Sequence, residues 1–407
     1  MSSYYRNFRN SVPWLILALE VVFIVVFYFL FSDDGTAISF VSYPDFQDVN
    51  HMVIFGFGFF LTFLKRYGFS STGFNFLIIV LGVQWSALME LLSGFFIELP
   101  EEDGLTKITK ATVSVTPVVI SAGAVLGKTN PVQLILMTVV EITFFHISKW
   151  INSIILQVPG SSNMVHVHLF GAYFGLAVSF FFSEPPPRSE KNASTSKSDL
   201  FSMLGTLFLW VFWPSFNSIL SVGENWKVAY NTYIALAVSA VTAFTLSAMT
   251  TKDGKFRMAH IHSAVLAGGV TLGCTDRRIQ YPWIAMILGL LASVINILGS
   301  YCLQGCFNPT LKIHDSAGVH FTFGFPAVLG ALAQVILMAL ERETYLPSLG
   351  HFILFYINSL CVTISVAVIT GLISGFILNL KLFKTAPVSK YFEDQFYWEF
   401  PHLAVGF

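Results

Sequence analysis

The sequence predicts an all-α polytopic membrane protein with about twelve transmembrane helices. Its 407 residues are 55% hydrophobic and only 11% charged, and the mean hydropathy is +0.69. Soluble globular proteins carry roughly 25% charged residues, so this composition is typical of a chain embedded in lipid. The net charge of −1 and the absence of a basic run argue against a nucleic-acid partner.

Twelve apolar segments account for the predicted helices. Charged residues or turn-forming glycine, proline and asparagine separate them, and most approach the roughly 20 residues that span a bilayer. The first segment follows Arg6 and Arg9 and lacks a small-residue cleavage site, so we expect a retained helix. The predicted spans are residues 13–32, 51–64, 74–96, 112–127, 131–148, 164–183, 200–220, 228–249, 258–273, 281–303, 318–340 and 352–380.

The basic residues predict the orientation of these spans. Fifteen lysines and arginines fall on the side of the two termini, and seven fall on the opposite side. Because cytoplasmic loops are enriched in basic residues, we expect both termini of this multi-pass protein to be cytoplasmic.

A hydrophilic stretch at residues 184–199 divides the chain. It holds three consecutive prolines followed by serine, lysine and glutamate, which predicts a flexible cytoplasmic loop. Apart from the first and the last span, five predicted spans lie on each side of it, and an odd number of spans per repeat predicts two inverted five-helix repeats. We therefore expect a transmembrane channel domain over residues 1–383 and a cytoplasmic tail over residues 384–407.

Two histidines occupy matching places in these halves. His168 lies about 117 residues into the first set of five spans, and His320 lies about 120 residues into the second. An ionisable side chain at membrane depth is costly and therefore marks a candidate functional site. A neutral imidazole offers one donor and one acceptor, so the pair predicts a pore for a small polar molecule or a proton. The alternative is that each histidine only makes structural hydrogen bonds between helices.

Other kinds of chemistry have little support. The four cysteines show neither metal-ligand spacing nor a disulfide framework, although Cys302 and Cys306 at a helix end are candidates for palmitoylation. No His-Glu-x-x-His or Gly-x-Ser-x-Gly motif of a hydrolase occurs. We therefore expect no enzymatic activity, no metal site and no cofactor.

Several specific stretches resemble the Rh branch of the ammonium transporter family. Among them are His168-Leu-Phe-Gly-Ala-Tyr-Phe-Gly and Asp315-Ser-Ala-Gly-Val-His320, and the resemblance extends over nearly the whole chain. Residues 122–128 and 210–218 add to it, and residues 262–270 and 390–407 are similar to the blood-group polypeptides of that branch.

The resemblance implies an ammonium-channel fold with a twin-histidine pore beneath a phenylalanine gate. His168 and His320 would be the twin histidines, Phe216 would be one gate aromatic, and Asp315 would be the acid at a helix end. It also implies a red-cell plasma membrane protein that forms a homotrimer or a heterotrimer with the Rh-associated glycoprotein. The C-terminal tail would then be a candidate contact for a cytoskeletal adaptor.

Four positions depart from the pattern of transporting family members. Gly160 stands where those members carry aspartate, and Lys149 stands where an acid of the outer vestibule is expected. Val113 replaces the other gate phenylalanine. Phe323 stands where a second histidine follows three residues after His320, and if that later position faces the pore, the histidine pair is broken.

Two functions fit this combination of retained and altered residues. The first is a conduit for ammonia or another small neutral gas such as carbon dioxide, with weakened recruitment of ammonium. The second is a non-conducting structural subunit that joins a transporting paralogue and the cytoskeleton in one membrane complex.

Overall fold

A computed structural model describes most of the chain. The described residues are 3–30, 41–94, 102–156, 163–183, 185, 191–219, 225–275, 279–303, 313–340, 346–383 and 385–400. Gly160, Cys306 and the side chain of Cys302 lie outside this description.

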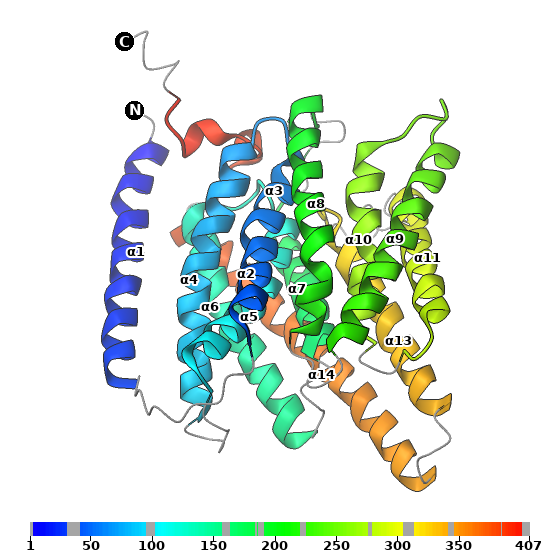
Figure 1. Ribbon diagram of the computed structural model, residues 1–407. Coiled ribbons are helices and arrows are strands. Elements are labelled where there is room, and N and C mark those ends of the chain that lie inside the picture. Colours follow the sequence, from blue (N-terminus) through cyan, green and yellow to red (C-terminus); the bar gives the residue numbers. More distant parts are fainter. Residues whose placement is uncertain are drawn as a thin grey trace.

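The described chain forms twelve helical segments that run side by side, which confirms the predicted all-α polytopic fold (Figure 1). Several of these segments combine α-helix with a turn of 3₁₀- or π-helix. They are α1 (Ser3–Leu30); α2 (Tyr43–Asn50) continued by η1 (His51–Gly56), α3 (Phe57–Phe60) and η2 (Leu61–Phe63); α4 (Gly68–Gly94); α5 (Gly104–Ala124); α6 (Pro131–Trp150) with η3 (Ile151–Ile155); α7 (Asn163–Ser179); α8 (Ser196–Ser218); α9 (Asn225–Thr250); α10 (Met258–Gly273); α11 (Pro282–Leu298) with η6 (Gly299–Leu303); η7 (His320–Gly324) with α13 (Phe325–Leu340); and α14 (Leu346–Leu378).

Eight of the described helices are long and apolar enough to cross a membrane by length and composition. The broken helix over residues 43–63, α5, α7 and α10 complete the twelve. α10 has only 16 residues and α7 only 17, and both are largely buried by their neighbours. A helix that other helices surround does not have to match the full thickness of the lipid core.

Two helix starts differ from the sequence-based expectation because of capping residues. The second helix begins at Tyr43 rather than near residue 51, since Ser42 and Asp45 form a capping box ahead of the apolar segment. In the same way Thr195 accepts from the Ser198 amide, so α8 begins inside the predicted hydrophilic loop. Polar caps of this kind carry no hydrophobic signal.

Small residues let the central helices approach closely. A side chain at Gly171 of α7 would place its Cβ atom 2.5 Å from the Pro117 carbonyl oxygen of α5, and at Gly175 2.6 Å from Ser121 Cα. The same kind of contact joins Gly268 of α10 to the Ala235 carbonyl of α9, at 2.7 Å. Close backbone packing through small residues is a main source of helix association in membranes. It fixes α7, which carries His168, directly against α5.

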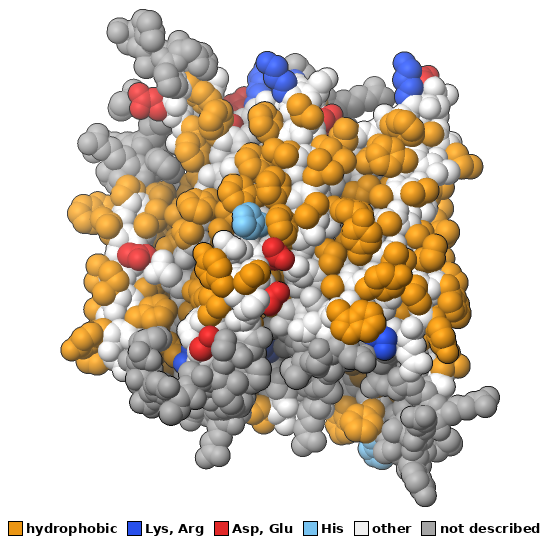
Figure 2. All heavy atoms as spheres, viewed as in Figure 1, with side chains coloured by type: hydrophobic (Ala, Val, Ile, Leu, Met, Phe, Trp, Pro, Cys, Tyr) orange, Lys and Arg blue, Asp and Glu red, His pale blue; other side chains and the backbone are white. Residues whose placement is uncertain are grey.

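Helix α1 lies at the edge of the bundle, and its most apolar window is only 11% buried. A cluster of apolar side chains packs it against α4, where Gln84 also donates to Glu20 at 3.2 Å and the rings of Phe23 and Trp85 stack at 5.8 Å. Hydrophobic side chains cover most of the bundle between its two ends in the view of Figure 2, and the lysine and arginine side chains in that view lie towards the ends. This distribution is that of a multi-pass membrane protein.

The last described residues fold back onto the bundle instead of leaving it. The segment comprises η9 (Val388–Lys390) and η10 (Asp394–Phe396) and lies at the face where α1 begins, hereafter the terminal face (Figure 1). The Asp394 carboxylate accepts from the amides of Phe69 at 3.0 Å and Ser70 at 2.8 Å and so caps the start of α4. The Phe392 amide donates to the Gly127 carbonyl at 3.0 Å.

Candidate functional site

His168 lies at the centre of the bundle and is completely buried. It sits one turn before Gly171, whose contact with α5 sets the depth and rotation of α7. The sequence therefore places an imidazole at membrane depth and holds its backbone in one position.

Aromatic rings surround the His168 imidazole. The ring centroids of Trp213 and Phe323 lie 6.0 Å and 6.1 Å from that of His168, with planes within about 22° of parallel. Phe216 is the third ring, at 6.5 Å. α7, α8 and η7 each contribute to this cluster, so both halves of the chain build it.

Neither ring nitrogen of His168 has a hydrogen-bond partner among the described residues, although both are buried. Burying a polar group without a partner costs roughly 1–3 kcal/mol or more. A small polar molecule that reached this ring would satisfy one of the two nitrogens. Two buried and unsatisfied nitrogens within an aromatic shell are therefore the chemical centre of the candidate site.

His320 lies in a different ring cluster. Its imidazole contacts Phe325 at 4.5 Å, Phe321 at 5.1 Å and Tyr173 at 5.9 Å between ring centroids. The structure thus brings Phe323, three residues after His320, into contact with His168, and places His320 beside Tyr173, further along α7.

Asp315 positions the helix that carries these residues. Its carboxylate accepts from the amides of Val319 at 3.0 Å and His320 at 2.9 Å, at the start of η7. A carboxylate there also interacts favourably with the helix dipole. Asp315 therefore orients η7, including Phe323.

Lys128 is a buried cation that the sequence analysis did not select as a candidate site residue. Its side chain is 0% exposed, and Nζ donates to Ser179 Oγ at 2.7 Å and to the His314 carbonyl at 2.6 Å. It joins the end of α5, the end of α7 and the loop before η7. The sequence signal for it was a lysine directly after a glycine turn, which is ordinarily a solvent-facing pattern.

The structure shows the contacts of Lys149 and Val113, two of the positions that depart from the family pattern. Lys149 of α6 forms an ion pair with Glu90 of α4 at 2.5 Å, and both side chains are less than a quarter exposed. The charge of Lys149 is therefore balanced by a neighbouring helix rather than presented alone to a cation. Val113 is buried in α5 as part of the main hydrophobic core.

His166 faces away from the aromatic cluster although it is only two residues from His168. Its Nδ1 lies 2.8 Å from Thr363 Oγ1 of α14, and Thr363 also accepts from Asn152 at 3.0 Å. This network joins α7 to α14.

Sequence analysis missed Trp213 and Tyr173 as neighbours of the two histidines, because ring contacts depend on how the helices cross.

The twelve-helix bundle, eight of whose helices are long and apolar enough to cross a membrane, defines a polytopic membrane protein. Comparison with known proteins gives the particular family: a model of the Ammonium Transporter Family matches residues 13–395, so the chain belongs to that family. The chain is 42% identical to an RH-like protein of Macaca mulatta over 416 residues, covering 100% of both sequences.

Two further relatives extend this comparison. The ammonium transporter Rh type B of Danio rerio is 39% identical, with 97% of this chain and 94% of the relative covered. Among solved structures, Rh50 of Nitrosomonas europaea, from the Rhesus protein family of channels, matches with a TM-score of 0.76 and 28% identity. That match covers 89% of this chain and 94% of the Rh50 chain.

Proposed function

We propose that the chain conducts a small neutral molecule, ammonia or carbon dioxide, past His168. The observation that carries this proposal is the pair of buried and unsatisfied ring nitrogens of His168 inside the shell of Trp213, Phe216 and Phe323. A neutral solute can accept or donate one hydrogen bond there without a counter-charge.

The shell favours a neutral solute over a cation. Ring contacts surround His168, and an ion that sheds its water in an apolar site loses several kcal/mol of solvation or more. Phe323 rather than His320 contacts the His168 ring, so the proposal rests on a single imidazole. A proton relay between two adjacent imidazoles has no support in this geometry.

Proteoliposomes that contain a pH-sensitive dye test the proposal. An inward ammonia gradient should raise the internal pH faster than in empty liposomes, whereas a carbon dioxide gradient should lower it faster. His168→Ala should reduce the rate several-fold, because the solute loses its hydrogen-bond partner. His166→Ala is the matched control on the same helix and should leave the rate near that of the unaltered protein.

Two results would contradict conduction through this site. One is a rate for the unaltered protein equal to that of empty liposomes. The other is an unchanged rate in His168→Ala protein that still folds, as judged by size-exclusion chromatography.

A second candidate function is a non-conducting subunit of a larger Rh complex. It is favoured by Phe323, which fills the place beside His168 that a second imidazole would need in a relay. On this view the chain forms a trimer with the Rh-associated glycoprotein at the plasma membrane and reaches the cytoskeleton through its C-terminal tail. Co-purification with the glycoprotein, lost or retained when residues 390–407 are deleted, tests the role of the tail.

The proposed orientation places the terminal face in the cytoplasm. It is supported by the excess of lysine and arginine on the side of the termini. A cysteine introduced at Lys197 should then react with a membrane-impermeant maleimide only after the cells are opened. Labelling of intact cells would reverse the orientation.

A further inference from the structure

A line of aromatic rings leads from His168 towards the terminal face. The ring centroid of Phe323 lies 6.1 Å from that of His168 and 6.4 Å from that of Phe60. The ring centroid of Phe60 in turn lies 5.1 Å from that of His262. A second imidazole therefore stands at the end of this line, with two phenylalanine rings between it and the first.

Helix α8 gives the direction of this line. His262 lies near the start of α10, and its backbone carbonyl accepts from Thr206 Oγ1 at 3.1 Å. The ring of His168 lies against Trp213, which follows Thr206 by seven residues on α8, or about 10 Å of helix. Because α8 begins at the terminal face (Figure 1), His262 lies closer to that face than His168 does.

His262 resembles His168 in its lack of hydrogen bonds. Its Nδ1 atom is buried and has no partner among the described residues. The residue as a whole is 7% exposed, against 0% for His168, so it lies nearer to the accessible surface of the bundle. A buried polar atom without a partner is unfavourable, and a small polar molecule at this atom would remove that cost.

Packing alone does not account for an imidazole at position 262. The rings of Phe60 and Phe63 contact it, at 5.1 Å and 5.9 Å between centroids. A leucine or phenylalanine could make similar apolar contacts without burying an unpaired nitrogen. The ring nitrogens are therefore what histidine adds at this place.

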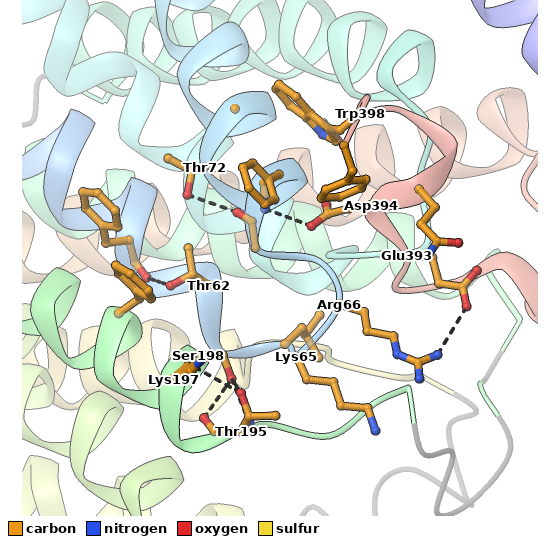
Figure 3. Close-up of a pocket in the computed structure, with 18 residues that line it drawn as sticks. Thr62, Lys65, Arg66, Thr72, Thr195, Lys197, Ser198, Glu393, Asp394 and Trp398 are labelled. Atoms are coloured by element: carbon orange, nitrogen blue, oxygen red, sulfur yellow. Dashed lines mark hydrogen bonds and ion pairs between the residues drawn. The ribbon is translucent and has the colours of Figure 1, made fainter. Parts of the chain in front are cut away.

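A cavity at the terminal face lies beside the line of rings but is not part of it. Its volume is about 890 Å³, and the described residues that line it include Phe59 and Thr62 but not Phe60, Phe63 or His262 (Figure 3). Thr62 Oγ1 donates to the Phe59 carbonyl at 2.6 Å, so this hydroxyl is engaged within its own segment. The helical segment that carries these phenylalanines thus separates the cavity from His262.

We propose that His262 is a second hydrogen-bonding position for the neutral solute, between His168 and the terminal face. The proposal rests on the proposed conduction past His168. A solute that leaves His168 passes the rings of Phe323 and Phe60 and is then stabilised by the unpartnered Nδ1 atom of His262. A neutral imidazole suits this position because one of its nitrogens donates and the other accepts. The two phenylalanine rings form the barrier between the two positions.

Ammonia uptake into proteoliposomes that contain a pH-sensitive dye tests this role. His262→Leu keeps apolar contacts and removes both ring nitrogens, so it should lower the rate about two- to tenfold, the range that one neutral hydrogen bond contributes. His262→Gln keeps a donor and an acceptor and should retain most of the rate. A packing role predicts the reverse order, since leucine suits the phenylalanine contacts better than glutamine does.

His260→Leu is the matched control. His260 lies on the same helix and also has a buried Nδ1 atom without a partner among the described residues. It stands roughly 200° around the helix from His262, away from the line of rings, so its loss should leave the rate near that of the unaltered protein. All variants are compared at equal amounts of folded protein, as judged by size-exclusion chromatography.

Three results would overturn the proposal. An unchanged rate in His262→Leu beside a reduced rate in His168→Ala would leave the proposed function in place and remove His262 from the route. Equal losses in His262→Leu and His262→Gln, or an equal loss in His260→Leu, would assign the effect to packing. An ammonia rate of the unaltered protein equal to that of empty liposomes would overturn the proposal together with ammonia conduction itself.

Discussion

At the scale of single residues, the neighbour of His168 decides which chemistry the centre of the bundle supports. Phe323 offers an apolar face where an imidazole would offer a donor and an acceptor. His320 is close in sequence but lies against Tyr173, Phe321 and Phe325. The site thus retains one polar group in a shell of rings.

Replacing Phe323 by histidine should add the missing second imidazole beside His168. The two rings could then hydrogen-bond to each other or to a solute in turn, so we expect methylammonium uptake into proteoliposomes to rise several-fold. Phe321→His, which adds a histidine beside His320 instead, serves as the control. Equal uptake by Phe323→His and the unaltered protein would show that position 323 does not limit conduction.

At the scale of helices, backbone contact between α5 and α7 fixes the site. Gly171→Ala would bring Cβ to 2.5 Å from a backbone oxygen, which cannot move without shifting α5. Overpacking of this kind costs about 1–3 kcal/mol, so we expect a lower thermal transition. Gly58→Ala, where no atom lies within 4 Å of the added Cβ, should leave the transition unchanged or raise it. A similar drop in both variants would contradict this account.

The helices themselves were largely predictable from the sequence, because apolar segments and basic loops report directly on the membrane. Helix starts such as Tyr43 and Ser196 were not, since their signal is a polar cap that resembles a loop. The burial of Lys128 was not predictable either, because lysine is rarely fully buried. In the candidate site, the sequence analysis selected His168 and position 323, whose rings lie in contact in the structure. It could not predict Trp213 as a ring partner, because the crossing of α7 and α8 is a tertiary property.

At the scale of the whole molecule, Lys128 and the loop before η7 connect the two halves. Lys128 and Ser179 belong to the first half, and the His314 carbonyl that both contact belongs to the second. Burial, with a smaller contribution from the charge of Lys128, lowers the pKa of His314 to about 4. Between about pH 4 and pH 6.5, the folded protein thus keeps His314 neutral, whereas the unfolded chain would protonate it.

This difference predicts a pH dependence of stability. The pKa of His314 in the folded protein lies below its ordinary value near 6.5. Its contribution to the free energy of unfolding is therefore complete above pH 6.5 and is lost as the pH falls towards 4. The loss should be on the order of 1–3 kcal/mol. Thermal unfolding in detergent should show this slope for the unaltered protein and a shallower one for His314→Gln. A slope that is the same in both proteins would assign the acid sensitivity to other groups.

The cap that Asp394 places on α4 also sets an order of assembly. The amides of Phe69 and Ser70 find their acceptor 325 and 324 residues later in the chain. At a synthesis rate of roughly 5–20 residues per second, that carboxylate emerges about 15 to 65 seconds after the helix it completes. A chain that ends before Asp394 therefore leaves the Phe69 and Ser70 amides at the start of α4 without this acceptor.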